Sequence, residues 1–246
     1  MAKLRFTFGT MGSGKSTQAL QIHHNLRVRG LTTLLISQLD RTEGRVSSRL
    51  GVSADAEIIQ PGVDLFELVR QRLKTVGSLN AVICDEAQFY EPVQCEQLAR
   101  VVDDLGVEVY AFGLLTTFQG VMFAGSARLM ELADVRNEIQ VEARCWCGAR
   151  ATHNARFVDG RQVVSGRTVV VGDTNPDAGA HVTYDLLCRR HWTEGANAAR
   201  GDQLELLDID MARVGDHPDR SGPVEVDPHS VPSSLQATGS ASGEPS

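Results

Sequence analysis

The chain has 246 residues, of which 42% are hydrophobic, 22% are charged and only 5% are aromatic. This length suffices for one sizeable hydrophobic core, or for one domain with a small satellite. The formal net charge of −7 argues against a protein that grips nucleic acid phosphates over a large surface. The chain has no long apolar run that would span a membrane, and its first residues do not resemble a secretory signal. We therefore expect a cytoplasmic protein.

The C-terminal residues differ in composition from the rest. Residues 215–246 hold five acidic residues, one basic residue and five of the eight prolines, and the last aromatic residue is Trp192. A segment of this kind cannot bury enough apolar area to offset the entropy lost on ordering. We expect residues 202–246 to form a C-terminal extension that is largely disordered from about residue 215.

A glycine-rich motif follows a short β-prone run at residues 4–8. Residues 9–16 read GTMGSGKS and fit the pattern G-x-x-x-x-G-K-[ST], in which backbone N–H groups surround phosphates. Lys15 would reach the β- and γ-phosphates, Ser16 would ligate Mg²⁺, and the helix that begins here would offer its N-terminus to the anion. The predicted nucleotide-contacting residues are Gly9, Thr10, Met11, Gly12, Ser13, Gly14, Lys15 and Ser16. The alternative is a glycine-rich turn that binds nothing, but the motif lies between a predicted strand and a predicted helix, as a phosphate-binding loop (P-loop) requires.

An acidic pair ends a second apolar run. Residues 80–85 (NAVICD) are typical of a buried parallel strand, and Glu86 follows directly. A P-loop needs one carboxylate to hold hydrated Mg²⁺, and we assign that role to Asp85. Glu86 would point to the other side of the strand end, where it could act as a general base on an attacking hydroxyl or water. The alternative is that Glu86 is a solvated loop acid.

The remaining pattern alternates strands with helices. Further strands are predicted at 32–37, 107–112 and 135–141, and helices after the P-loop and at 63–76, 92–104 and 125–132. The proline at position 92 suits the first position of a helix. The pattern predicts an α/β fold for residues 1–141, with a P-loop NTPase-like (RecA-like) parallel sheet flanked by helices. Its ligand site would lie at the carboxyl ends of the strands.

The cysteines predict a metal site in residues 142–201. Cys145 and Cys147 are separated by one residue, and Cys188 and His191 follow later in the chain. Two such pairs, joined by a long loop, suggest a structural Zn²⁺ held by three cysteines and one histidine. The alternative is a set of unrelated free thiols in a reducing compartment. Cys84 and Cys95 lie in an apolar strand and in a helix, and we expect both to be buried packing residues.

Several of these motifs together resemble one family, the bacterial and cytosolic (type II) thymidine kinases. The resemblance runs in order over about residues 3–192. It is carried by GTMGSGKST at 9–17, VSSRLG at 46–51, DEAQF at 85–89, LLTTFQG at 114–120, CWCG at 145–148 and CRRH at 188–191.

The resemblance implies a reaction and a nucleotide site. The γ-phosphoryl group of ATP would be transferred to the 5′-hydroxyl of thymidine, giving thymidine monophosphate for DNA precursor synthesis. Glu86 matches the catalytic base of the family, and residues 9–16 match its ATP loop. The second nucleotide segment comprises Asp85, Glu86, Ala87 and Gln88. Asp40 and Arg41 resemble an acid–arginine pair that approaches the phosphates.

The resemblance also implies a thymidine site and an assembly. Phe118 would pack on the thymine base, Tyr184 would lie near the sugar, and Met11 would line the same pocket. A strand called the lasso would read the base edge through its backbone, and it matches Thr168, Val169, Val170, Val171 and Gly172. Residues 142–201 would then form a zinc-ribbon or lasso domain. The implied cofactors are ATP, Mg²⁺ and structural Zn²⁺, and the implied assembly is a homotetramer that binds neither nucleic acid nor membrane.

Two other classes of protein fit parts of the sequence. A P-loop ATPase acting on nucleic acid would use Glu86 to activate water, but the acidic composition and the lack of a basic stripe with interleaved aromatic residues argue against it. A non-enzymatic zinc-ribbon module would suit the arginines around the cysteines. The intact P-loop with an acid at the end of another strand argues against a catalytically silent protein.

Overall fold

The structure is a computed structural model that describes residues 1–38, 44–48, 50–139, 142–166 and 182–195. All of these residues belong to one compact unit, Met1–Gln203. The predicted C-terminal extension lies outside the described residues. The predicted division of the remaining chain at residue 141 stays a prediction.

A six-stranded sheet forms the centre of the N-terminal part, in the order β5-β2-β6-β7-β1-β8. Every pairing between neighbouring strands is parallel. The predicted parallel sheet is therefore confirmed, and the predicted strand positions differ from the observed ones by a few residues at most. The strands are β1 (Leu4–Phe8), β2 (Thr33–Ser37), β5 (Glu57–Ile58), β6 (Ala81–Asp85), β7 (Glu108–Gly113) and β8 (Val135–Glu138).

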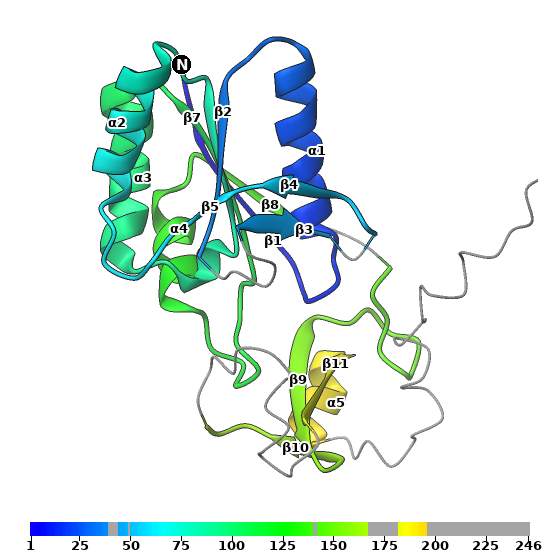
Figure 1. The fold of residues 1–246 in the computed structure, drawn as a ribbon. Helices are drawn as coiled ribbons and strands as arrows, with labels where there is room; N and C mark the ends of the chain where they lie inside the picture. Colours follow the sequence, from blue (N-terminus) through cyan, green and yellow to red (C-terminus); the bar gives the residue numbers. More distant parts are fainter. Residues whose placement is uncertain (39–43, 49, 140–141, 167–181, 196–246) are drawn as a thin grey trace, which may run out of the picture. The chain divides into compact units, whose positions relative to one another are not determined.

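Helices cover both faces of this sheet (Figure 1). Alternate side chains of β6 show why: Val82 and Cys84 join the larger apolar cluster with α2, α3 and α4, whereas Ile83 joins a smaller cluster with α1. Cys84 and Cys95 are both fully buried, as predicted. The helices are α1 (Lys15–Val28), α2 (Leu65–Val76), α3 (Pro92–Leu105) and α4 (Ala124–Leu132), with a short 3₁₀ helix η1 (Ala87–Phe89) after β6. Pro92 is the first residue of α3, as predicted.

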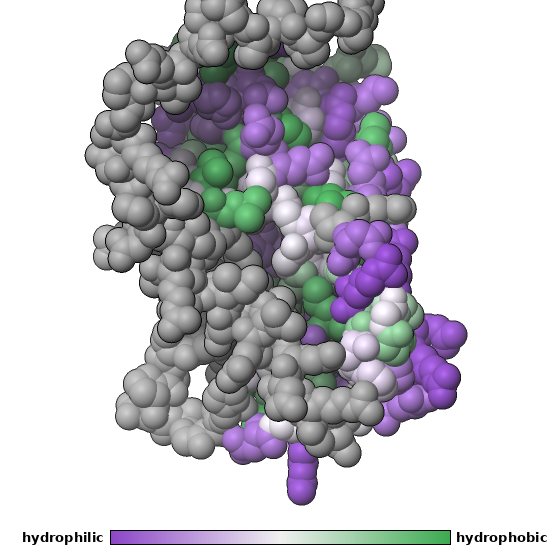
Figure 2. Space-filling view, turned by 90° about the vertical axis from the view of Figure 1, so that its right-hand side faces the viewer, coloured by the Kyte–Doolittle hydropathy of each residue, from purple (hydrophilic) through white to green (hydrophobic). Residues whose placement is uncertain are grey.

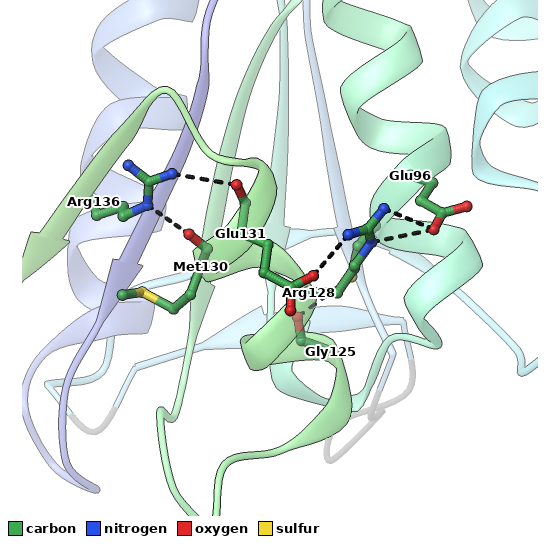
Figure 3. Close-up of polar contacts among 7 residues, drawn as sticks. Glu96, Gly125, Arg128, Met130, Glu131 and Arg136 are labelled. Atoms are coloured by element: carbon green, nitrogen blue, oxygen red, sulfur yellow. Dashed lines mark hydrogen bonds and ion pairs between the residues drawn. The ribbon is translucent and has the colours of Figure 1, made fainter.

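Side chains fix α4 against α3 and, at its C-terminus, against the following strand β8 (Figure 3). Arg128 lies between Glu96 of α3 and Glu131 of its own helix, at 3.0 and 2.7 Å. The thiol of Cys95 donates to the carbonyl of Gly125 in the first turn of α4. Arg136 donates to the carbonyls of Met130 and Glu131, which are left without a helical partner at the C-terminus of α4. These contacts hold α4 against α3 and β8.

Three short strands between β2 and α2 were not predicted. β3 (Arg45–Ser47) and β4 (Ser53–Asp55) form an antiparallel hairpin, and β5 adds two residues to the edge of the main sheet. Segments of two or three residues carry too little hydrophobic alternation to be recognised as strands. They are stabilised by long-range pairing and by the packing of Val46 against α1.

The predicted second part contains a separate antiparallel sheet of three strands, in the order β10-β9-β11. Its buried apolar cluster holds four residues, Cys145, Ala155, Phe157 and Leu187, with Cys188 and Trp192 packed against it. So small a cluster provides little hydrophobic stabilisation, which makes a stabilising metal reasonable. The elements are β9 (His153–Val158), β10 (Arg161–Val163), β11 (Val182–Leu187) and α5 (Arg189–Glu194).

The surface is mixed in character. Figure 2 shows a face on which polar side chains predominate and apolar ones occur in small areas between them. Scattered exposed apolar residues are normal for a folded protein and do not by themselves indicate a binding site. Within the described ranges, no helix combines the length and the apolar character needed to cross a membrane.

The buried His23 on α1 gives the fold a dependence on pH. Its Nδ1 lies 2.9 Å from the Thr33 hydroxyl of β2, and burial lowers the pKa of His23, with the charge of Arg27 adding to the effect. The unfolded chain takes up this proton at about pH 6.5, whereas the folded chain resists it. Stability from His23 is therefore present above about pH 6.5 and is lost as the pH falls below that value.

The free energy of unfolding should fall between pH 7.5 and pH 5.5, and we expect it to fall less in His23→Gln than in the unmodified chain. Urea denaturation at the two pH values measures this difference. The exposed His24 on the same helix supplies the matched control: its charge is the smallest of the three causes of the lowered pKa of His23, so His24→Gln should leave most of the loss in place. An equal loss in the unmodified chain and in His23→Gln would contradict the assignment.

Candidate functional site

A cavity of about 400 Å³ lies at the carboxyl ends of the central strands. It is lined by the P-loop, by Asp85 at the end of β6 and Glu86 directly after it, and by Leu114 after β7. The structure thus brings together the two motifs that the sequence predicted to form one site. A larger cavity of about 740 Å³ lies between α1 and the β3–β4 hairpin. Of the motif at residues 9–17, Thr17 alone lines this larger cavity. The smaller cavity is the candidate active site because it holds the phosphate-binding and acidic groups together.

The P-loop has the backbone shape that phosphate binding requires. Gly14 precedes α1 with a φ of 81° and provides no side-chain cap, so the first N–H groups of the helix remain available to an anion. Only glycine adopts such a φ at little cost. The Lys15 ammonium donates to the carbonyl of Thr10 at 2.7 Å and lies 3.3 Å from the Ser13 hydroxyl. The cation is therefore held beside the loop that would surround the phosphates.

The two acids at the carboxyl end of β6 differ in environment. Asp85 is 4% exposed, and burial, together with the nearby Glu86 charge, raises the pKa of Asp85 to about 6, although a hydrogen bond with Ser16 acts in the opposite direction. A cation beside Asp85 would favour its ionised form. Glu86 is half-buried and has a φ of 54°, a left-handed conformation that costs a non-glycine residue about 1–3 kcal/mol. Strain of this kind is often found at catalytic positions.

Asn154, which the sequence analysis did not identify, links the P-loop to the three-stranded sheet. Asn154 of β9 is 4% exposed, and its side-chain oxygen accepts a hydrogen bond from the Met11 N–H at 2.9 Å. Its amide nitrogen donates to the carbonyl of Thr116 at 3.4 Å. This buried amide connects the nucleotide loop to the segment that precedes Phe118. No local signal marks Asn154, because both of its partners are distant in sequence.

The predicted base-contacting residues lie near each other but do not line the cavity described above. Phe118 is 4% exposed, its ring lies 5.3 Å from the Arg156 guanidinium, and its carbonyl accepts the indole N–H of Trp192. Tyr184 on β11 is half-buried and pairs in register with Arg156 on β9. Arg156 therefore contacts the Phe118 ring and pairs across the sheet with Tyr184, the two aromatic residues that the family resemblance assigned to thymidine.

The four predicted metal ligands come together. The three cysteine sulfurs and the histidine ring nitrogen of Cys145, Cys147, Cys188 and His191 all lie within 4.8 Å of one another. The Nδ1 atom of His191 is 3.3 Å from the Cys145 sulfur and 3.4 Å from the Cys188 sulfur, and the sulfurs of Cys147 and Cys188 are 3.9 Å apart. Tetrahedral zinc with ordinary bond lengths would separate such ligands by about 3.5–3.8 Å. The cluster fits a zinc ion, and Trp146 stacks on His191 with ring centroids 3.9 Å apart.

Some predicted site residues cannot be placed. Asp40 and Arg41, and the lasso residues Thr168, Val169, Val170, Val171 and Gly172, lie outside the described residues. Conversely, the cavity includes residues that the sequence analysis did not assign to the site, among them Ser37, Arg45 and Phe89. Ser37 could have been found, since it ends a parallel strand next to β6.

Fold and site together define an α/β nucleotide-binding protein of the P-loop class. Residues 2–192 match the family model described as Thymidine kinase. The chain is 53% identical over 192 residues to a thymidine kinase of Streptomyces avermitilis, and 54% identical over 194 residues to one of Streptomyces coelicolor. Each match covers 78% of this chain and 88% of the relative. A thymidine kinase of Cutibacterium acnes is 46% identical over 196 residues, covering 79% of this chain and 90% of the relative. The chain therefore belongs to the thymidine kinase family.

Among solved structures, a Pif1 helicase from Candida albicans aligns with a TM-score of 0.35 and 16% identity, over 57% of this chain and 36% of that one. A likeness this weak carries no inference about fold or function.

Proposed function

We propose that the chain is a thymidine kinase that transfers the γ-phosphoryl group of ATP to the 5′-hydroxyl of thymidine. The observation that carries this proposal is the single cavity that holds the P-loop, Asp85 and Glu86. Membership of the thymidine kinase family supports the choice of acceptor. The rival nucleic-acid ATPase would need the same phosphate-binding groups, but it receives no support from the family match.

The nucleotide half of the proposed site consists of residues 9–16 with Asp85, Glu86, Ala87 and Gln88. The P-loop N–H groups and Lys15 would neutralise phosphate charge, which is the main contribution that proteins make to phosphoryl transfer. Ser16 and Asp85 would hold Mg²⁺, which supplies further charge neutralisation when bound. Asp40 and Arg41 remain proposed phosphate-contacting residues on the strength of the family resemblance.

The acceptor half requires a base and a thymine pocket. Glu86 faces the cavity and is proposed to take the proton from the 5′-hydroxyl as that oxygen attacks phosphorus. Met11, Phe118, Tyr184 and the lasso residues are proposed to surround the nucleoside. The proximity of both Phe118 and Tyr184 to Arg156 supports a shared pocket on this side of β9.

Further proposals concern the metal, the assembly and the location. A structural Zn²⁺ on Cys145, Cys147, Cys188 and His191 is supported by their separations. A homotetramer rests on the family resemblance alone. A cytoplasmic location suits an ATP-dependent enzyme in which none of the five cysteines forms a disulfide.

The reaction is tested by incubating the full chain with Mg-ATP and each of the common nucleosides, then separating products by charge. Thymidine monophosphate is the expected product, with the other nucleosides giving far less. Failure of every nucleoside to yield a monophosphate would overturn the kinase proposal. ATP hydrolysis that is stimulated by DNA, without any nucleoside phosphorylation, would favour the rival ATPase.

A further inference from the structure

The side chain of Gln88 joins the proposed catalytic base to the neighbouring strand. Gln88 is 2% exposed in η1, and its amide nitrogen donates to the Glu86 carboxylate at 2.6 Å. Its side-chain oxygen accepts the backbone N–H of Leu114, just beyond β7, at 3.0 Å. Because a backbone N–H can only donate, the amide oxygen must face Leu114, which leaves the amide nitrogen facing Glu86. The orientation of the amide is thus determined by chemistry at both ends.

The surroundings leave Gln88 little freedom to move. A side chain at position 113 would place its Cβ 2.9 Å from both the backbone nitrogen and the side-chain oxygen of Gln88, so the strand can approach this closely only because residue 113 is glycine. The carbonyl of Leu114 in turn accepts a hydrogen bond from the Ser126 hydroxyl of α4 at 2.5 Å. The Gln88 amide therefore accepts a hydrogen bond from Leu114, whose own carbonyl is hydrogen-bonded to helix α4.

The fixed Gln88 amide restricts the position of the Glu86 carboxylate. The Glu86 backbone is left-handed, and Glu86 is one of the residues that line the cavity. A hydrogen bond to an ionised acceptor is stronger than one between neutral groups, and a buried donor held on rigid elements restricts where the carboxylate can lie. Proton transfer demands that the base stay within hydrogen-bonding distance of the reacting hydroxyl.

We propose that Gln88 is a positioning residue for the reaction: it holds the Glu86 carboxylate toward the acceptor hydroxyl and acts through Glu86 rather than by binding ATP. This inference rests on the proposed function, in which Glu86 is the base. For Gln88 alone, it replaces the nucleotide-binding role that the family resemblance gives to residues 85–88 and that the proposed function adopts above.

The first test removes the amide while keeping its approximate volume. We expect Gln88→Leu to lower kcat by about tenfold to a hundredfold, the cost of a misplaced catalytic group, and to leave the KM for ATP nearly unchanged. Gln88→Glu keeps the acceptor for Leu114 but replaces the donor to Glu86 with an oxygen, so its kcat should fall at least as far. An unchanged kcat in Gln88→Glu would show that Gln88 merely braces Leu114 and would overturn the proposal, as would a raised KM for ATP as the main effect.

The chain offers a matched control for the loss of a buried amide. Gln94 is 1% exposed, accepts the Glu91 N–H and donates to the Val63 carbonyl, both at 3.0 Å, and lies outside the candidate site. Gln94→Leu likewise removes one bond accepted from a backbone N–H and one donated by the amide nitrogen, here to a neutral carbonyl, so it should lower the unfolding temperature like Gln88→Leu but preserve kcat. Equal losses of kcat in the two variants would mean that general destabilisation explains the effect.

A double-mutant cycle separates this inference from the proposed role of Glu86. If Gln88 acts through Glu86, then adding Gln88→Leu to Glu86→Gln should change kcat less than twofold, because the base is already absent. Independent effects that multiply would overturn the positioning role while leaving Glu86 as the base. If Glu86→Gln alone has normal activity, the proposed base is wrong instead.

Discussion

Glu86→Gln should lower kcat by at least ~10²-fold, because the neutral amide cannot accept the proton of the attacking hydroxyl. The substitution preserves the size of the side chain and leaves Lys15, Ser16 and Asp85 in place. We therefore expect the KM for ATP to stay within about threefold of the unmodified value, because ground-state binding of the phosphates is unaffected. Steady-state phosphorylation of thymidine, with ATP varied at saturating thymidine, measures both parameters.

Two controls make this result interpretable. A thermal unfolding curve matching that of the unmodified chain would show that Glu86→Gln folds normally. Relief of the left-handed strain is not expected, because glutamine has the same Cβ as glutamate and meets the same backbone restriction. Near-normal turnover in a folded Glu86→Gln protein would remove Glu86 from the role of base.

Cys188→Ser should reduce the zinc content from about one ion per chain toward zero, since a structural site of this kind uses four ligands and closes around the metal. The apolar cluster among the described residues of this part holds four buried residues, so loss of the metal should also loosen residues 142–166 and 182–195. Metal analysis of the purified protein measures the first effect. Limited proteolysis, with the cleavage sites mapped, measures the second.

The matched control for Cys188→Ser is Cys95→Ala. Cys95 is also a free thiol, but it is fully buried against α4 and takes no part in the metal cluster. Its replacement should cost some stability while leaving about one zinc ion per chain. Cys188→Ser protein that retains the metal content of the unmodified chain would favour the alternative of unrelated thiols.

Much of the fold and of the candidate site could be predicted because the signals are local. The P-loop lies within eight consecutive residues, and Asp85 ends a continuous apolar run, so the rule that ligands bind at the carboxyl ends of parallel strands was enough to place them together. The helices were equally clear from apolar spacing and from Pro92. Short-range pattern thus determined the central sheet and the acidic pair.

The unpredicted features depend on contacts between distant segments. Asn154 is 143 positions from Met11, and the Gln88 acceptor bond comes from a residue 26 positions away. The β3–β4 hairpin, which brings Arg45 to the cavity, consists of two three-residue strands whose sequence alone gives no periodic signal. Such contacts follow from the assembled structure, in which tertiary packing outweighs local preference.

The hydrogen bonds of Asn154 have a consequence that reaches beyond geometry. They connect β9, which the zinc site is proposed to stabilise, to the Met11 N–H in the loop that would bind ATP. If zinc favours the binding-competent shape of the loop through this contact, ATP must raise the affinity for zinc by the same factor, because linkage between binding equilibria is reciprocal. We therefore expect bound ATP to increase the fraction of zinc that the protein retains at equilibrium with a given concentration of chelator. The structural metal and the substrate would then protect one another.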